Sequence, residues 1–456
     1  MTGIAAAVMQ CIFWVLLVLV IVLPVRLSIV VYLILVQFDM GGLGNYSIGS
    51  LGFENAIKTI AIPSLLLARI RPLHPLPPGC QVLCRSWLLL ICYAVIATSW
   101  SPFPLSGVKM VGYLYAYAIM FLVLTAAWQR GWLSDKSISA VVAITLVLAV
   151  LQSYVFGNPY GNPEYENRFT TFAGAATFSP FLLCLLVLIL FRGALTTSKI
   201  VAAFGALVGL LLAGGRSAFV GFAWTLLMAG LAYTRRARGG IHFGPVLRTA
   251  ALSALVVVCI IMMVQWLLPG NRLNEFFTSS KSGVSEVRNV ETFAWRLDLY
   301  ERALSELQNR GVSRLLIGSG TSSGVIVSLD NDFSYDGIAD PNRSLHEEFL
   351  RSAYEWGLPG FGAIVLFLCA SVRLGWRSAR SGNREGWAFL AISVPILFSF
   401  LIENILADGA SPGGIGYTLV LASMVASLSP NPVHVRLVRS DAEYSEKYSR
   451  SDARLL

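Results

Sequence analysis

The segment that decides the fold is NRSLHEEFLRSAYEWGLPGFGAIVLFLCASV, residues 342–372. Its first part gathers one histidine, three glutamates and two arginines, whereas no charge follows Glu355 within it. A run of roughly 20 apolar residues is long enough to cross a bilayer as a helix, which satisfies its backbone groups internally. The stretch therefore predicts a polar segment that leads directly into a membrane-spanning helix near residues 353–372.

The rest of the chain repeats this alternation of apolar runs and polar connectors. Of the 456 residues, 56% are hydrophobic and 13% are charged, whereas soluble domains carry about 25% charged residues. This composition predicts an all-α, polytopic membrane protein of 12 or 13 transmembrane helices. Residues 4–38 are expected to form two short helices or one helix broken at Pro24, and a short span is expected near 56–69. Further spans are expected near residues 86–105, 108–127, 138–156, 169–191, 199–215, 217–234, 247–268, 386–404 and 414–430.

The placement of lysine and arginine predicts the orientation, because cytoplasmic connectors carry an excess of these residues. The predicted cytoplasmic segments are Arg69–Arg85, Arg130–Lys136, Arg192–Lys199, Arg235–Arg248, Arg373–Arg384 and a tail over 431–456. The segments predicted on the opposite side are 101–109, 157–168, Arg216, 269–351 and 403–414. The chain thus divides into N-terminal transmembrane helices (1–268), a long periplasmic loop (269–352), C-terminal transmembrane helices (353–430) and the tail.

The long loop is predicted to be partly helical. Apolar residues recur on one helical face of AWRLDLYERALSELQNRG, residues 294–311, and Gly311 is placed to end the helix. The residues on this face are Leu297, Tyr300, Leu304 and Leu307. The next segment, RLLIGSG (314–320), is predicted to be a short strand-like piece stopped by glycines.

Neither a metal nor a nucleotide site is predicted, and no cofactor is expected. Cys80 and Cys84 form a C-x₃-C pair without further ligands. The aspartates of residues 330–340 do not have the spacing of a calcium-binding loop, which favours a solvated acidic loop. GSGTSSG (318–324) does not match the glycine spacing of a nucleotide-binding loop.

His346 is the one histidine, of four, that the predicted topology places outside the cytoplasm. A neutral imidazole is the usual side chain for accepting a proton near pH 7. The alternative is a histidine that is hydrogen-bonded at the start of a helix. Glu347 and Glu348 suit that alternative equally well, because carboxylates are favourable near a helix N-terminus.

Several arginines are predicted on the same side as His346. Arg216, in GGRSA (214–218), is the one charged residue between Lys199 and Arg235 and is expected at the outer turn of a helical hairpin. Charges in this position are candidates for function, although an arginine that reaches lipid phosphates is the alternative. Arg296 begins the amphipathic helix of the loop, where a solvated arginine is the alternative.

One histidine and several arginines on one membrane face favour a diphosphate ligand. Guanidinium groups bind phosphate oxygens in pairs and neutralise the charge of a departing diphosphate, while a histidine accepts the proton of an attacking hydroxyl. These requirements are those of glycosyl transfer from a polyprenyl diphosphate sugar. Further candidates for contact with this substrate are Arg168, Arg343, Tyr300 and Glu348.

The hairpin arginine in GGRSA, the LLIGSG segment and a histidine followed by two glycines at the entry to a helix resemble the O-antigen ligase and polymerase superfamily. The resemblance extends from about Arg168 to Leu368. It implies an enzyme of the bacterial inner membrane that transfers a polysaccharide from undecaprenyl diphosphate to an acceptor hydroxyl at the periplasmic side, without metal or nucleotide. The catalytic residues that it implies are Arg216, Arg296 and His346.

Two departures from the ligase pattern bear on the choice between polymerase and ligase. The pattern Arg-x₃-Leu has tyrosine at its last position here, in Arg296 to Tyr300. The pattern His-[Asn/Ser/Gln]-x₉-Gly-x-x-[Gly/Thr/Tyr] has glutamate at its second position, after His346. These departures favour a polymerase that extends an O-antigen or exopolysaccharide.

Two alternatives to a polymerase stay open. An O-antigen ligase would join the glycan to lipid A-core, and a transporter or flippase of the lipid-linked sugar would also need arginines for the diphosphate. The expected partners are the undecaprenyl-diphosphate-linked glycan, an acceptor that is either a lipid-linked glycan or lipid A-core, and membrane lipids. A chain-length regulator is a further candidate partner, and no nucleic acid is expected.

Overall fold

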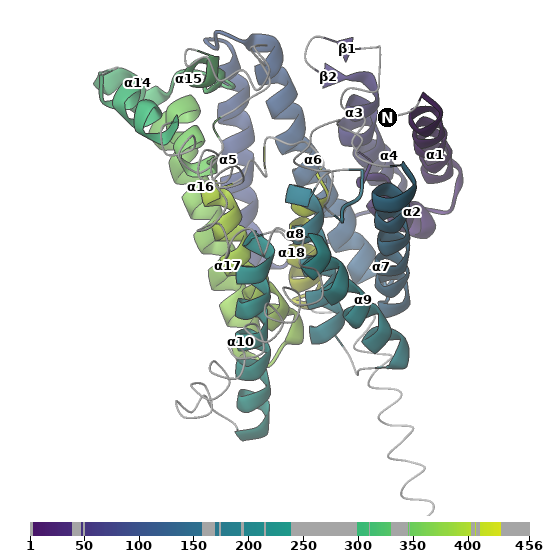
Figure 1. Cartoon of the computed structure of the whole chain (residues 1–456). Helices are drawn as coiled ribbons and strands as arrows, with labels where there is room; N and C mark the ends of the chain where they lie inside the picture. Colours follow the sequence, from purple (N-terminus) through teal and green to yellow (C-terminus); the bar gives the residue numbers. More distant parts are fainter. Residues whose placement is uncertain are drawn as a thin grey trace, which may run out of the picture.

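The computed structural model describes residues 3–38, 47–48, 51–156, 169–172, 175–192, 196–213, 216–238, 299–309, 311–329, 345, 347–402, 406 and 411–429. Within these residues the protein is a bundle of helices. Two short strands, β1 (Ser47–Ile48) and β2 (Leu51–Gly52), pair as an antiparallel hairpin at one end of it (Figure 1). The fold is that of an all-α polytopic membrane protein, as predicted.

Five described helical segments are long and apolar enough to cross a membrane. They are α5 (Gln81–Thr98), α6 (Pro104–Gln129), α7 (Asp135–Val150) with the π-helix η3 (Leu151–Phe156), α16 (Glu348–Arg380) and α17 (Arg384–Ile402). Further apolar helices are α1 (Gly3–Val22), α2 (Val25–Leu35), α8 (Ala175–Phe191), α9 (Thr197–Ala213), α10 (Arg216–Arg238) and α18 (Pro412–Ser427). These helices overlap the predicted spans. The largest departures are α5, which begins five and ends seven residues before the predicted span of 86–105, and α16, which begins five residues before and ends eight residues after the predicted span of 353–372. The span expected at 247–268 lies outside the described residues.

The N-terminal apolar run forms two helices with a break at Pro24. Leu23 and Pro24 separate α1 from α2, and the two helices pack against each other. The guanidinium of Arg69 donates to the carbonyls of Val20 at 2.9 Å and Leu23 at 2.5 Å, which lack intrahelical partners at the end of α1. Arg69 ends α4 (Ile62–Arg69), which follows α3 (Phe53–Ala56) and the π-helix η1 (Ile57–Ala61) where the short span was expected.

The centre of the bundle is formed by α18, whose residues are buried from Pro412 to Ala426. A helix that is apolar on all sides is buried on all sides. Its glycines allow close packing: a Cβ on Gly414 would lie 2.4 Å from the hydroxyl of Tyr117 in α6. A Cβ on Gly416 would lie 3.1 Å from Cβ of Cys184 in α8. Small residues serve the same purpose between membrane helices generally.

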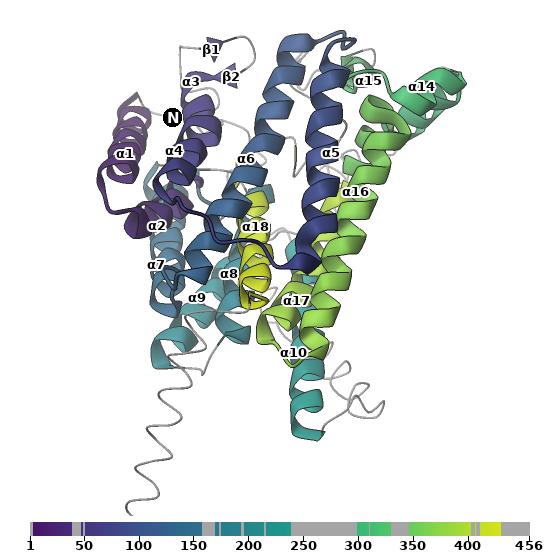
Figure 2. The same ribbon diagram turned by 180° about the vertical axis from the view of Figure 1, so that it is seen from behind.

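The predicted strand at residues 314–320 is wrong, because this segment contains the short helix α14 (Val312–Ile317). Gly311 and Gly318 bound the helix with φ of 80° and 79°, which favours glycine. The preceding helical stretch, residues 299–309, confirms the predicted helix in its described part. A second short helix, α15 (Val325–Leu329), lies with α14 at the end of the bundle where α5 and α6 are connected (Figure 2).

Contacts among the lysine- and arginine-rich connectors confirm that they share one end of the bundle, here named the basic face. Asp135 lies 2.5 Å from Nζ of Lys199 and 4.0 Å from the guanidinium of Arg192. Arg192 also pairs with Glu385 at 3.6 Å. The guanidinium of Arg130 donates to the carbonyl of Pro72. The guanidinium of Arg235 donates to the backbone carbonyl of Arg380 at 2.5 Å. Each of these five connectors thereby contacts at least one of the others. Their cytoplasmic location stays a prediction.

The opposite end of the bundle is named the site face. There the hydroxyl of Ser101, between α5 and α6, donates to the carbonyl of Thr321 at 2.5 Å. The hydroxyl of Tyr117 lies 3.3 Å from that of Ser411, just before α18. The backbone N–H of Leu406 donates to Glu348, the first residue of α16, at 2.6 Å. Segments predicted on one side of the membrane therefore meet there.

Candidate active site at the start of α16

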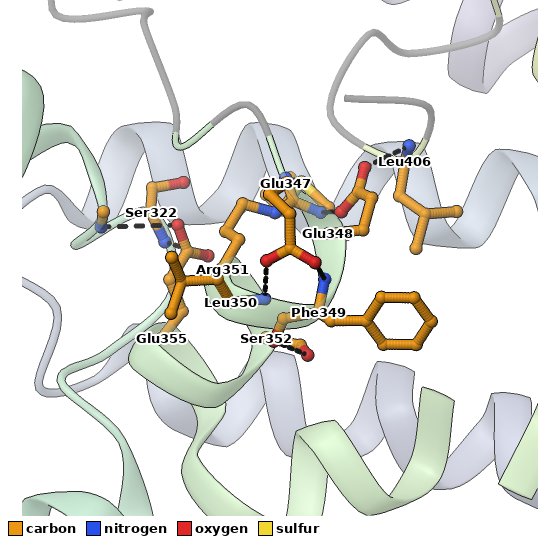
Figure 3. Close-up of polar contacts among 11 residues, drawn as sticks. Ser322, Glu347, Glu348, Phe349, Leu350, Arg351, Ser352, Glu355 and Leu406 are labelled. Atoms are coloured by element: carbon orange, nitrogen blue, oxygen red, sulfur yellow. Dashed lines mark hydrogen bonds and ion pairs between the residues drawn. The ribbon is translucent and has the colours of Figure 1, made fainter. Parts of the chain in front are cut away.

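The start of α16 is fixed by its N-cap residue, Glu347. The Glu347 carboxylate accepts hydrogen bonds from the backbone N–H of Phe349, at 3.2 Å, and of Leu350 (Figure 3). These are N–H groups that the first helical turn leaves without partners. On the other side of position 346, Leu345 is fully buried in a small apolar cluster with Leu299 and Tyr354. The two neighbours of His346 in the chain are therefore both held firmly.

Three charged residues of the first two turns of α16 are buried. Glu348, Arg351 and Glu355 follow at intervals of three and four residues, so they share one helical face. Their exposed fractions are 0%, 1% and 1%. Buried charges are costly unless they are paired and hydrogen-bonded. A set of three such residues therefore indicates a site that the fold is built to maintain.

Arg351 and Glu348 form the centre of this set. Nη2 of Arg351 pairs with Oε2 of Glu348, while the other oxygen of Glu348 accepts from the N–H of Leu406 at 2.6 Å (Figure 3). Nη1 of Arg351 lies 3.4 Å from the sulfur of Met110 in α6. The pair thus joins α16 to α6 and to the connector between α17 and α18.

Glu355 holds a second segment, the loop of residues 318–324. Its carboxylate accepts from the backbone N–H of Ser322 at 2.9 Å and of Gly324 at 3.4 Å. Ser322 has φ of 65°, and no other described residue except glycine has positive φ. Successive N–H groups in such a turn form a small anion-binding concavity. In GSGTSSG this concavity is occupied by the carboxylate of Glu355.

The loop is also bound to α5 and to the rest of α16. Thr321 is fully buried; its hydroxyl donates to the carbonyl of Ala94 at 2.6 Å and accepts from the indole N–H of Trp356 at 3.1 Å. The backbone N–H groups of Ser319 and Gly320 donate to the carbonyls of Tyr354 and Glu355 at 2.9 and 3.0 Å. This polar loop therefore forms part of the interior at the site face.

A break in α16 at Gly357 makes this arrangement possible. Gly357 has φ of 57° and ψ of −154°, so the helix continues in two parts on either side of it. A Cβ on Gly357 would lie 2.6 Å from N of Gly318 and from O of Leu316. A Cβ on Gly318 would lie 2.3 Å from the carbonyl oxygen of Glu355. The two glycines therefore mark the place where α14 and α16 touch backbone to backbone.

Burial raises the pKa of the Glu347 carboxyl to about 7, even though its two backbone hydrogen bonds act in the opposite direction. The neighbouring carboxylate of Glu348 raises this pKa further, and the guanidinium of Arg351 lowers it. The residue next to His346 in the chain is therefore a carboxyl group that titrates near neutral pH.

This pKa predicts a pH-dependent stability. Because the pKa is higher in the folded protein than its ordinary value of 4.5, the contribution of Glu347 is complete below pH 4.5 and is lost as pH rises through 7. We expect the apparent melting temperature of the wild type to fall relative to that of Glu347→Gln between about pH 5 and about pH 8. A difference that stays constant over this range would contradict the assignment.

Most of the site residues predicted from the sequence lie outside the described residues. Arg216 is the first residue of α10, and its side chain is not described. The hydroxyl of Tyr300 donates to the carbonyl of Leu401, at the end of α17, at 3.4 Å. Glu348 lies at the start of α16, with both carboxylate oxygens on protein groups. The predicted residues outside the described ones are Arg168, Arg296, Arg343 and His346.

The structure adds Arg351 and Glu355 to the candidate residues, and sequence reasoning assigned neither of them a role. The sequence did contain a pattern that could have identified them, because charged residues at this spacing fall on one face of an otherwise apolar helix entry. The N–H groups that bind Glu355 could not have been identified from the sequence, because every residue except proline has a backbone N–H group. Arg351 fixes the first turn of α16 to α6, and Glu355 fixes the loop of residues 318–324 to α16.

Residues 201–365 of the chain match a protein family described as O-antigen ligase. The match begins in α9, includes Arg216, Arg296 and His346, and ends in the second part of α16. It confirms the predicted resemblance to the O-antigen ligase and polymerase superfamily. No curated protein sequence matches the chain.

Proposed function

We propose that this protein is a membrane glycosyltransferase, because residues 201–365 match a family described as O-antigen ligase. Its donor is a glycan on undecaprenyl diphosphate, and its acceptor is a hydroxyl of a second lipid-linked glycan. It thus acts as a polymerase of O-antigen or exopolysaccharide, and the reaction needs neither metal nor nucleotide. The site face is proposed to lie at the periplasmic side of the bacterial inner membrane.

The observation that carries this proposal is the buried arrangement at the start of α16. The N-cap Glu347 and the buried Leu345 hold the chain on both sides of His346. The pair of Arg351 and Glu348 fixes this turn to α6. A side chain that transfers a proton requires such fixed geometry, because small displacements cost much of the rate.

The proposed reaction assigns a role to each predicted catalytic residue. The imidazole of His346 accepts the proton of the acceptor hydroxyl as its oxygen attacks the anomeric carbon of the donor glycan. The bond from that carbon to the diphosphate oxygen breaks, and undecaprenyl diphosphate leaves with the bonding electrons. The guanidinium groups of Arg216 and Arg296 neutralise the charge that develops on the diphosphate. Arg168, Arg343 and Tyr300 are proposed to contact the substrate.

The distribution of charge favours an enzyme over a transporter. Transporters bind their substrates near the bilayer midplane, with polar groups lining the path. Here the helices α8 and α18 carry no charged residue, and α5, α6, α7, α9, α10 and α17 are uncharged through their middle. The buried charges of α16 lie within its first two turns, at the site face.

The experiment that tests this function uses the purified protein in lipid nanodiscs. It is supplied with lipid-linked repeat units extracted from the source bacterium, with and without lipid A-core. Longer glycans that remain on undecaprenyl diphosphate support the polymerase. Glycan attached to lipid A-core identifies a ligase instead. Intact donor in both reactions, with movement of the donor across liposome membranes, would identify a transporter and contradict the proposal.

A further inference from the structure

The short helix α14 exposes an unusual amount of apolar surface. Val312, Leu315, Leu316 and Ile317 have exposed fractions of 73%, 43%, 47% and 50%. Four large apolar residues in a six-residue helix make a continuous apolar patch outside the bundle. Such a patch in a polar loop indicates a surface that contacts protein or membrane.

The position of α14 indicates what covers this patch. The hydroxyl of Tyr93 in α5 donates to the carbonyl of Ile317 at 2.9 Å, so the end of α14 lies beside α5. On α5 itself, Val95 and Ile96 are 51% and 57% exposed, as expected for residues that face lipid. Both ribbon views show α14 projecting from the side of the bundle near the site-face end of α5 (Figures 1 and 2). The end of α14 therefore lies beside a helix that also exposes large apolar residues.

Two aromatic residues lie near the end of α14. Tyr93 and Trp100 pack edge to face with ring centroids 6.3 Å apart at the site-face end of α5. Tyrosine and tryptophan are enriched at the level of the lipid headgroups. Arg314, the basic residue of α14, is exposed, and an arginine at this level extends its guanidinium to lipid phosphates.

We propose that α14 lies in the boundary between headgroups and acyl chains of the leaflet at the site face, with Val312, Leu315, Leu316 and Ile317 in contact with lipid. Short apolar helices with a basic residue bind this zone through buried apolar area and attraction to phosphate. The occupant of the patch is therefore lipid, rather than a second copy of the chain or another protein.

The contact of α14 with α16 gives this membrane contact a role in the reaction. The carbonyl oxygens of Leu315 and Leu316 lie against Gly357, where a Cβ would approach them to 2.8 and 2.6 Å. The loop that follows α14 is held by Glu355. The depth of α14 in the leaflet thus fixes the level of the first turn of α16 relative to the lipid headgroups. The diphosphate of a lipid-linked donor lies at this headgroup level. This second step rests on the proposed function, whereas the lipid contact does not.

Quenching by spin-labelled lipids tests the lipid contact directly. All seven cysteines of the chain are replaced by alanine, and a single cysteine is then introduced by Val312→Cys. It is labelled with an environment-sensitive fluorophore in nanodiscs that contain one protein each. The lipids carry a nitroxide on the upper acyl chain, and no donor or acceptor is present.

Two matched positions calibrate the measurement. Val95→Cys reports the lipid-facing surface of α5, and Gln308→Cys reports an exposed polar position of the helical residues 299–309. We expect the Val312 probe to be quenched about as strongly as the Val95 probe and about twofold more than the Gln308 probe.

Two results would overturn the inference. A Val312 probe quenched no more than the Gln308 probe would place α14 in water. Blue-shifted emission without quenching would place it against protein. Because no substrate is present, a failure of the proposed glycosyl transfer leaves this result unaffected, and a failure here leaves the transfer assay unaffected.

Discussion

Replacement of Gly357 by alanine is expected to disrupt the fold of the site, because this residue lies where α14 and α16 touch backbone to backbone. At φ of 57° and ψ of −154° an alanine is strained, and its Cβ would lie 2.6 to 2.8 Å from backbone atoms of Leu315, Leu316 and Gly318. Backbone atoms of two helices cannot move aside as a flexible side chain does. We expect a loss of stability on the order of 3 kcal/mol or more.

The apparent melting temperature of the purified protein in detergent measures this loss, and glycan transfer should be lost with it. Gly362→Ala is the matched control, because it lies in the second part of α16 and a Cβ there meets nothing within 4 Å. In a helix interior this change is expected to be neutral or to stabilise by up to about 1 kcal/mol. Equal melting temperatures for the two variants would refute the backbone contact between α14 and α16.

Replacement of Arg351 by methionine is also expected to destabilise the protein strongly. The variant would leave the carboxylates of Glu348 and Glu355 buried in α16 without the guanidinium of Arg351, which pairs with Glu348. Removal of one partner from a buried ion pair costs about 3–5 kcal/mol, because the other charge stays buried and unpaired. We expect a correspondingly lower apparent melting temperature, together with loss of transfer.

The double variant Arg351→Met with Glu348→Gln distinguishes this mechanism from a loss of packing. It removes one of the stranded carboxylates, so it should regain part of the stability that the single variant loses. Arg377→Met, at an exposed position of the same helix, serves as the control and should melt close to the wild type. A double variant that melts below the single variant would exclude charge as the cause.

The membrane spans were predictable because an apolar run of sufficient length satisfies its backbone hydrogen bonds within a bilayer by forming a helix. The break after α1 followed in the same way from Pro24 in a run too long for one helix. The helix α14 was not predictable, because VSRLLI between two glycines resembles a short strand. Its conformation depends on Gly357, which lies 40 residues after Ile317 in the chain, and on the carbonyls that α14 presents to it.

The candidate site was predictable only in its residue types. A histidine with glutamates and arginines before an apolar run indicated a functional helix entry, and the buried charges lie there. Their partners were not predictable, because the N–H groups that bind Glu348 and Glu355 belong to Leu406, Ser322 and Gly324. These partners are separated from the glutamates by 58, 33 and 31 residues. Such contacts are set by the packing of α5, α6 and α16 rather than by local sequence.

The release of undecaprenyl diphosphate by the protein in nanodiscs, compared between the wild type and His346→Ala, tests the central claim most directly. His74→Ala, at an exposed position of the basic face, is the control. If His346 accepts the proton of the attacking hydroxyl, its loss should lower the rate by about 10²–10⁴-fold while binding of undecaprenyl diphosphate and the melting temperature stay close to those of the wild type. Release by His346→Ala at the rate of His74→Ala would contradict a site at the start of α16.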